Sequence, residues 1–519
     1  MVNEGLQVFD KLTGTSLLGP IQLRSIWLGF GDTCPNSGAG DPVVVYDRLA
    51  DRWIVSQFAA KFLDIQDECI AVSQTGDATG AWYRYDFRLT SISGRMQDYP
   101  KLGIWPDGYF MSAIMFEGQN DLGVKPFVFD RAKMLVGDPA ATLQTTRGII
   151  SKDFFLPSDL DGVIPPPAGA PNFFVAVTIA VDEEEAPAPK GSQANAPLPQ
   201  AAQTPPPVYK VWAFHVDWDN PANSSFTLRA NVPAADFTVL VCRDEQGQLD
   251  LHCVPQLGVR ALLDAISDRL MFRNAYRRFP DGRESMLNNL TVSANSVAGI
   301  RWFELQRMLP NGWTLRQQST YQPNSTWRWM GSIASDNQGN IALGFSASSE
   351  TIHPQIRYAG RFATDPLGIL SGERHLFDGT GSQWEESRWG DYSDLTIDPV
   401  DDCSFYYTNE YYAKTGLYDE KTGGGAKWKT RIGYFKFPGC TPPPNATAHF
   451  MVLDRGEPLP NALVSIDGIL YGATLADGTY DAVLPPGLHA YAVVNRALVT
   501  QTGSFTITNG QTTIVEGRF

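Results

Sequence analysis

The stretch from Val43 to Phe58, VVVYDRLADRWIVSQF, decides the fold. Two runs rich in β-branched and aromatic residues flank a polar segment that opens with Asp47, a pattern typical of two antiparallel strands joined by a tight turn. The same pattern recurs from Leu102 to Phe116, from Ser332 to Ser346 and from Leu395 to Asn409. A third strand-like piece follows each hairpin: CIAVSQT, FVFDRAK, IRYAGRF or RIGYFKF. The sequence therefore predicts a repeated antiparallel unit.

The length of this unit identifies the architecture. Turn aspartates recur about 60 residues apart, as between Asp47 and Asp107, and roughly 60 residues for three or four antiparallel strands is the size of a β-propeller blade. More degenerate units, from Asn172 to Trp218 and from Asp264 to Glu304, fill the gaps and make six. The predicted fold class is all-β, a β-propeller.

The number of blades depends on the first residues. Leu6 to Lys11 is similar to Pro126 to Arg131, a late strand of the second unit, so the chain begins in mid-blade. Either this strand closes a six-bladed ring, or it remains from a seventh blade whose first strands lay upstream. We expect seven blades, with the first incomplete. A truncated chain would also explain why MVNEG lacks the basic and apolar regions of a signal peptide.

Composition excludes several function classes. The chain has 41 Lys and Arg against 56 Asp and Glu, a net charge of −15, and a phosphate backbone repels so acidic a surface. Nucleic acid is therefore not an expected partner. The clean apolar run from Phe173 to Val181 is about half of the roughly 20 residues that a membrane-spanning helix needs, so no transmembrane segment is predicted.

Two Pro-rich stretches divide the chain. Residues 182–207, DEEEAPAPKGSQANAPLPQAAQTPPP, are acidic and too poor in apolar side chains to fold, so we expect a disordered insertion inside a domain. Residues 441–445 read as a Pro-rich linker. We therefore expect a propeller over residues 1–440 and a small separate domain over residues 446–519.

The six cysteines fall into three pairs that are local in sequence. Each pair brackets a loop or hairpin, which a disulfide stabilises in an oxidising compartment. The alternative is six free thiols in the core. No CxxC occurs, so structural zinc is not predicted. We expect a secreted or cell-surface protein with three disulfides, Cys34–Cys69, Cys242–Cys253 and Cys403–Cys440.

Longer motifs carry a resemblance to known proteins. GDPVVVYDRLADRW, DYPKLGIWPDGYF, WRWMGSIASDNQGNIALGFS and RWGDYSDLTIDPVDDCSFYYTNEYY resemble a family of uncharacterised, secreted bacterial β-propellers, loosely grouped with the sialidase-like propellers. The resemblance covers most of residues 1–440 and implies a fold but no established activity. In this family an inner-strand segment precedes the position of Met1, which favours truncation. Residues 446–519 are similar to carboxypeptidase-regulatory-like or PEGA-type β-sandwich modules, which are surface accessories.

Catalytic signatures are scarce. HExxH, GxSxG, GxxxxGK[ST] and GxGxxG do not occur, and the six histidines form no close pair at metal-ligand spacing. A Ser-His-Asp triad assembles from distant positions, and no residue nominates one. Whether the protein is an enzyme therefore stays open.

One pattern of polar residues lies just ahead of the innermost strands, where propeller side chains converge on the central channel. Asp41, Lys101 and Asp391 precede their hairpin turns by six or seven residues, so we expect them at the same end of the channel. Glu410 and Tyr392 fit the pattern less well and are more typical of blade packing. The full candidate set is Asp41, Asp98, Lys101, Asp159, Asp161, Arg328, Trp329, Arg388, Trp389 and Asp391.

Three interpretations of this set remain open. Asp at a strand start often only caps a turn and ties neighbouring blades together. Alternatively, the carboxylates bind a hard cation, with Asp41 and Asp391 as calcium ligands, or bind sugar hydroxyls while Trp faces stack on the ring. In the third interpretation two carboxylates act as glycosidase acid and nucleophile.

The function that we expect is an extracellular binding or scaffold module for glycans or a surface protein. The first alternative is a secreted glycoside hydrolase or lyase that uses channel carboxylates. The second is a structural subunit of an extracellular assembly or homo-oligomer, because an unpaired strand edge invites strand addition. Calcium is the one cofactor predicted.

Overall fold

The computed structural model describes most of the chain and is almost entirely β. Its helical elements, among the described residues, are α2 (Arg131–Met134) and the 3-10 turns η1 (Leu23–Trp27) and η2 (Pro221–Asn223). No described helix has the length and apolar character needed to cross a membrane. The described residues are 5–31, 33–36, 40–62, 65–89, 96–118, 120–146, 151–178, 206–239, 241–243, 249–250, 252–384, 386–416 and 427–519.

The chain forms successive antiparallel meanders, which we call sheets; the first three have four strands each, and the third is joined to the fourth by the parallel pairing of β11 with β19. The first comprises β3 (Val43–Asp47), β4 (Arg52–Phe62), β5 (Ile65–Ser73) and β6 (Trp82–Arg88). The second comprises β7 (Met96–Trp105), β8 (Gly108–Glu117), β9 (Asn120–Phe129) and β10 (Leu143–Thr145). The third comprises β11 (Phe155–Asp161), β12 (Asn172–Thr178), β13 (Val208–His215) and β14 (Ser225–Pro233).

The next three sheets repeat the meander. The fourth comprises β19 (Leu270–Arg278), β20 (Glu284–Ala294), β21 (Val297–Arg307) and β22 (Thr314–Tyr321). The fifth comprises β23 (Trp327–Ser335), β24 (Ile341–Ser349), β25 (Ile352–Arg361) and β26 (Ser371–Asp378). The sixth comprises β27 (Asp394–Ile397), β28 (Ser404–Tyr412) and β29 (Trp428–Lys436). Short pairs separate the third and fourth sheets: β15 (Cys242–Arg243), β16 (Leu249–Asp250), β17 (His252–Val254) and β18 (Leu263–Asp264).

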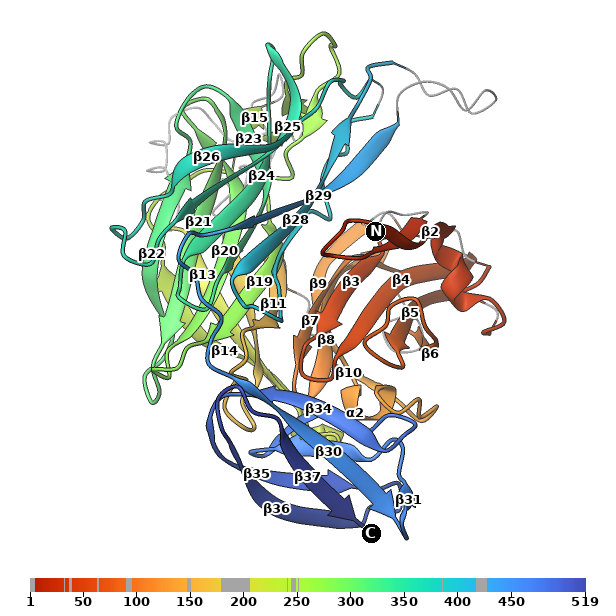
Figure 1. Cartoon of the computed structure of the whole chain (residues 1–519). Helices are drawn as coiled ribbons and strands as arrows, with labels where there is room; N and C mark the ends of the chain where they lie inside the picture. Colours follow the sequence, from red (N-terminus) through yellow and green to blue (C-terminus); the bar gives the residue numbers. More distant parts are fainter. Residues whose placement is uncertain are drawn as a thin grey trace, which may run out of the picture.

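The first strands of the six sheets line one channel. Strand β7 contacts β3 and β11, β11 pairs in parallel with β19, and β23 contacts β19 and β27. The ring closes where Arg48, after β3, donates to the carbonyl of Pro399, after β27. The predicted β-propeller is thereby confirmed (Figure 1).

The first residues form a hairpin of their own. Strand β1 (Gly5–Phe9) pairs with β2 (Ser16–Gln22) and not with β29. Leu6 packs with Leu23 and Val55 on the first sheet, while Lys11 ion-pairs with Asp398 of the sixth at 2.7 Å. The hairpin thus bridges the sixth and first sheets, and six versus seven blades stays a prediction.

The last eight strands form two facing sheets of four, joined to the propeller at its first sheets (Figure 1). Phe450, Val464 and Tyr480 fill the space between them. The predicted linker, residues 441–445, falls between β29 and the first of these strands. The strands are β30 (Ala446–Asp454), β31 (Glu457–Pro458), β32 (Leu463–Ile466), β33 (Ile469–Ala473), β34 (Thr479–Leu484), β35 (Gly487–Val494), β36 (Thr500–Ile507) and β37 (Thr513–Arg518). We call this unit the C-terminal module.

A buried arginine holds the module against the propeller. Arg131, with no exposed surface, ion-pairs with Asp47 at 2.6 Å and donates to the carbonyls of Leu470 and Tyr471 in the module. The Tyr480 hydroxyl donates to the carbonyl of Leu49. The module therefore covers the channel end at which β3 turns into β4.

The three predicted disulfides are confirmed. Each joins cysteines whose Cα atoms lie 5.8 to 6.0 Å apart, within the normal range for such a bond. Most of the segment predicted to be a disordered insertion, residues 182–207, lies outside the described residues.

Candidate functional site

Residues within or just ahead of three first strands meet at one end of the channel, opposite the C-terminal module. Asp98 and Lys101 belong to β7, Asp41 precedes β3, and Arg388 and Asp391 precede β27. We call this end the channel mouth and define it by Asp41, Asp98, Tyr99, Lys101, Arg269, Arg388, Asp391 and Tyr392. Five of these eight residues belong to the set predicted from sequence.

Backbone irregularities place these side chains. Tyr99 and Asp41 both have a φ of 54°, a left-handed conformation that is uncommon outside glycine. The pairing of β7 with β8 shifts register between Asp98 and Lys101. As a result the Tyr99 amide donates to Asp41 and Asp98 at 3.2 and 2.8 Å. Residues held in such conformations concentrate at functional sites.

Lys101 is enclosed at the mouth. Its side chain is 1% exposed, and Nζ lies 3.7 Å from the ring centre of Tyr99 and 3.6 Å from that of Tyr392. Nζ also donates to the backbone carbonyl of Asp391 at 3.0 Å. Burial lowers the pKa of Lys101 to about 7, although the charges of Asp391 and Asp41 oppose that shift. The amine is therefore poised to gain or lose a proton near neutral pH.

The Asp98 carboxyl lies beside the Asp41 carboxyl, whose charge also acts on Lys101. Burial and, to a smaller extent, the adjacent Asp41 carboxylate together raise the pKa of Asp98 to about 6. Two carboxylates in such proximity do not both ionise readily. Below about pH 6 Asp98 is therefore mainly protonated, and its hydroxyl can donate a hydrogen bond.

Arg388 gives the mouth an exposed cation. Its side chain is 62% exposed and ion-pairs with Oδ2 of Asp391. Oδ1 of Asp391 is buried and has no hydrogen-bond partner among the described residues. Trp384, in the same loop, is 48% exposed, and its neighbour Gln383 donates to the carbonyl of Arg388. The loop thus carries an exposed cation and an exposed indole four residues apart in sequence.

Asp159 and Asp161 lie deeper in the channel. Arg273 ion-pairs with both, at 2.7 and 2.8 Å, and its side chain is 2% exposed. Asp394 completes this layer, and burial raises its pKa to about 7 while Arg273 acts in the opposite direction. Arg273 neutralises Asp159 and Asp161, so this pair of contacts is a structural support beneath the mouth, whereas Oδ1 of Asp394 is buried without a hydrogen-bond partner among the described residues.

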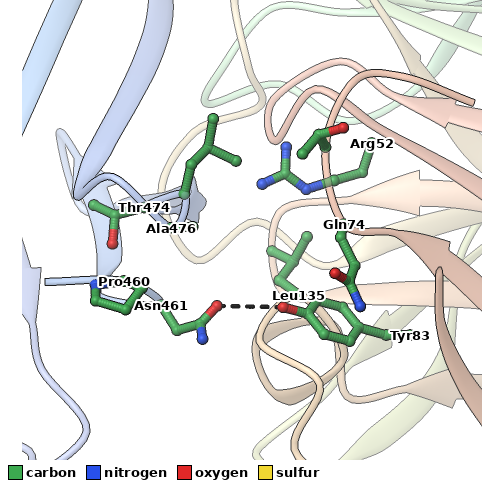
Figure 2. Close-up of a pocket in the computed structure, with 10 residues that line it drawn as sticks. Arg52, Gln74, Tyr83, Leu135, Pro460, Asn461, Thr474 and Ala476 are labelled. Atoms are coloured by element: carbon green, nitrogen blue, oxygen red, sulfur yellow. Dashed lines mark hydrogen bonds between the residues drawn. The ribbon is translucent and has the colours of Figure 1, made fainter. Parts of the chain in front are cut away.

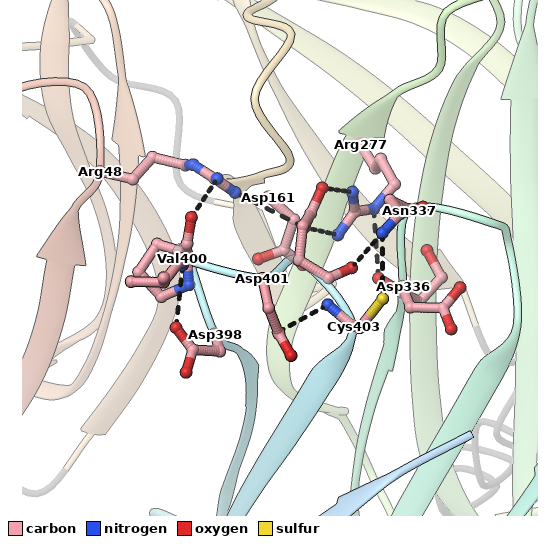
Figure 3. A network of polar contacts seen from close by, with 12 residues as sticks. Arg48, Asp161, Arg277, Asp336, Asn337, Asp398, Val400, Asp401 and Cys403 are labelled. Atoms are coloured by element: carbon pink, nitrogen blue, oxygen red, sulfur yellow. Dashed lines mark hydrogen bonds and ion pairs between the residues drawn. The ribbon is translucent and has the colours of Figure 1, made fainter. Parts of the chain in front are cut away.

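The far end of the channel is filled by a second network (Figure 3). Arg277 forms a two-pronged ion pair with Asp402, at 2.8 Å for each nitrogen, and Arg48 lies 3.9 Å from the same carboxylate. Asn337 donates to the backbone carbonyl of Asp402. All of these side chains come from or adjoin hairpin turns.

Three predicted residues are placed elsewhere. Arg328 is fully buried and ion-pairs with Glu373 of the fifth sheet at 2.9 Å. Trp329 and Trp389 are at most 1% exposed, and their rings pack 6.2 Å apart. Neither indole therefore offers a face on which a sugar could stack. Glu410 is half-buried in the sixth sheet, where burial raises its pKa to about 8.

Sequence reasoning missed Tyr99 and the channel arginines. Arg269, Arg273 and Arg277 recur every four residues, and in a strand such residues share one face. From that spacing, a row of arginine side chains on one face of the segment that contains β19 could have been predicted. Tyr99 carried no signal, because only the bulge in β7 turns its ring over Lys101.

Calcium binding by Asp41 and Asp391 stays a prediction. Among the described residues, one group of three potential metal ligands lies within 4.8 Å, Cys34, Cys69 and Asp86. Its two sulfurs form a disulfide and are not available as thiolates. At the mouth, Arg388 and Lys101 already place positive charge beside Asp391.

Comparisons with known proteins give distant structural likenesses. No family model matches the chain, and no curated protein matches it. An endo-arabinase from Bacteroides thetaiotaomicron is 12% identical, with 63% of this chain and 95% of that chain covered and a TM-score of 0.29. An ulvan lyase is 9% identical, with 82% and 87% covered and a TM-score of 0.37. Trypanosoma rangeli sialidase with sialic acid is 8% identical, with 82% and 55% covered and a TM-score of 0.35. At these scores the likenesses carry no argument about function.

Proposed function

We propose that this protein is an extracellular β-propeller that binds one sugar unit of a glycan at the channel mouth. The observation that carries the proposal is the convergence of Asp41, Asp98, Lys101, Arg388 and Asp391 from three sheets. These residues are far apart in sequence, and their amine, carboxyl and guanidinium groups meet at the end of the channel that the C-terminal module does not cover.

The chemistry of the mouth suits a polyhydroxylated ligand. The carboxyl oxygens of Asp41 and Asp98 accept hydrogen bonds, and below about pH 6 the protonated Asp98 also donates one, as a sugar hydroxyl requires. Oδ1 of Asp391 is a buried acceptor without a partner among the described residues, and such groups are costly unless a ligand or water satisfies them. Arg388 is positioned for a ring hydroxyl or a sugar carboxylate. Trp384 is the exposed aromatic side chain on which a ring could stack.

Disulfides support the extracellular assignment. Three disulfide bonds form from all six cysteines, and such bonds persist in oxidising compartments. Intact mass under non-reducing conditions should lie six protons below the mass of the reduced chain. Six thiols open to alkylation would contradict the assignment.

The test of binding is calorimetric titration of the full chain with a panel of neutral and uronate-containing oligosaccharides. We expect at least one to bind, with Asp98→Asn and Lys101→Met each weakening its affinity tenfold or more. Glu457→Gln, an exposed change in the C-terminal module, should leave the affinity unaltered. Absence of binding across the panel, or variants that bind as the wild type does, would refute the proposal.

A second candidate function is glycan cleavage by hydrolysis or elimination. It is favoured by one observation: Asp98, a carboxyl group with a pKa of about 6, and Lys101, an amine with a pKa of about 7, both lie at the channel mouth on β7. Such a pair is suited to general acid and base roles near neutral pH. Incubation with the bound oligosaccharide should then yield new reducing ends, and Lys101→Met should abolish them. A bound but intact oligosaccharide would assign the protein to the binding class.

A further inference from the structure

A separate pocket lies between the propeller and the C-terminal module (Figure 2). Its volume is about 140 Å³, close to that of a cavity of about 150 Å³ known to accommodate benzene. The first sheet of the propeller supplies Arg52, Gln74 and Tyr83 to its wall, and the module supplies Asn461 and Thr474. The pocket therefore has room for a ligand of roughly six non-hydrogen atoms.

Arg52 is a buried cation without a matching anion. Its side chain is 4% exposed, and Nη1 donates to the carbonyls of Ala50 and Asp51. Nε is buried without a hydrogen-bond partner, and no ion pair to Arg52 occurs among the residues that the structure describes. Asp47, its cross-strand neighbour, is already ion-paired with Arg131. A buried cation without an ion-pair partner lowers the stability of the folded protein unless an anion binds next to it.

The rest of the wall is neutral. In a chain with a net charge of −15, none of the ten lining residues is acidic. Gln74 and Asn461 provide amide donors from opposite sides, and the Tyr83 hydroxyl lies 3.4 Å from Oδ1 of Asn461. Leu135 and Pro460 add apolar surface, which an inorganic oxyanion would not use. Figure 2 shows the Arg52 guanidinium directed toward this space.

We propose that this pocket binds a small organic carboxylate, with Arg52 pairing to its carboxyl group and the apolar wall covering its carbon skeleton. The ligand would contact both units at once. Because a ligand that binds only the docked state stabilises that state, binding should also favour attachment of the module to the propeller. This site is independent of the channel mouth.

The test uses lactate, a carboxylate with six non-hydrogen atoms, titrated into the full chain by calorimetry. Lactamide, its uncharged counterpart, and sulfate are the comparison ligands. We expect lactate to bind at least tenfold more tightly than either. The proposal would be overturned if lactamide or sulfate bound as tightly as lactate, or if lactate at tens of millimolar produced no heat of binding.

Variants localise the binding. Arg52→Gln should weaken lactate binding tenfold or more. Arg52 also hydrogen-bonds the backbone of its own turn, so loss of binding in Arg52→Gln could reflect a disturbed turn. Asn461→Asp is therefore a second, independent variant. Asp tolerates the left-handed φ of 60° at this position, and its negative charge should repel a carboxylate ligand. Arg496→Gln, an exposed change of the same charge in the module, should alter affinity less than twofold. Lactate binding that persists in Asn461→Asp would place the ligand elsewhere and contradict the assignment.

Discussion

At the scale of single residues, Lys101 should make stability depend on pH. Burial lowers its pKa from 10.5 to about 7, so between these values the unfolded chain binds a proton that the folded chain lacks. The contribution of Lys101 to the free energy of unfolding therefore rises with pH from about 7 to 10, by at most about 1.4 kcal/mol per pH unit. Lys101→Met should remove this contribution. Urea unfolding of both proteins across that range measures it, and parallel pH profiles would contradict the assignment.

Arg273 gives a second prediction for a single residue. It is the shared partner of Asp159 and Asp161, so Arg273→Met should leave two buried carboxylates without their cation. Removing one partner of a buried ion pair typically costs about 3–5 kcal/mol. Arg496→Gln, an exposed change, should cost less than about 0.5 kcal/mol. Equal unfolding free energies for the two variants would show that the channel layer contributes no stability.

Residue types ahead of the first strands could be predicted, but not which way each side chain faces. Tyr99 and Met330 both have a left-handed φ, at 54° and 49°, and both lie within a register shift. Asp98, before Tyr99, reaches the mouth, whereas Trp329, before Met330, enters an apolar cluster. A shift of one residue turns a side chain to the other face of a strand. Bulges of this kind carry no dependable sequence signal.

At the scale of elements, the disulfides that close the longest and the shortest loop should differ in their contribution to stability. Cys403 and Cys440 close a loop of 37 residues, whereas Cys242 and Cys253 close one of 11. Loop-closure entropy assigns about 4 kcal/mol to the first bond and about 1 kcal/mol less to the second. Urea unfolding of the two double Cys→Ser variants tests this order. A larger loss for the shorter loop would show that native contacts, not chain entropy, dominate.

Hairpins were the elements most accessible to prediction, because their signal is local. Val43 to Phe58 contains β3, its turn and most of β4, and the spacing of turn aspartates located the equivalent hairpins. Pairing between hairpins was not accessible. The parallel contact of β11 with β19, which joins Ser158 to Asn274, brings together segments that no sequence pattern relates.

At the scale of the whole molecule, Arg131 should couple the module to the propeller. Arg131→Gln removes a buried cation that contacts Asp47 and two module carbonyls. We expect one calorimetric unfolding transition in the wild type and two in this variant, because the units lose their attachment. Tyr480→Phe, which removes one hydrogen bond to Leu49, should lower the melting temperature and leave one transition. Two transitions already present in the wild type would contradict this coupling.

The central claim is that side chains from three sheets form one ligand site at the channel mouth. The most direct measurement is a crystal structure of the full chain grown with the oligosaccharide that binds most tightly in the calorimetric panel. We predict density for a sugar ring within hydrogen-bond distance of Asp98, Arg388 and Asp391. Density for the sugar on an outer blade face, with the mouth closed by its own side chains, would contradict the account.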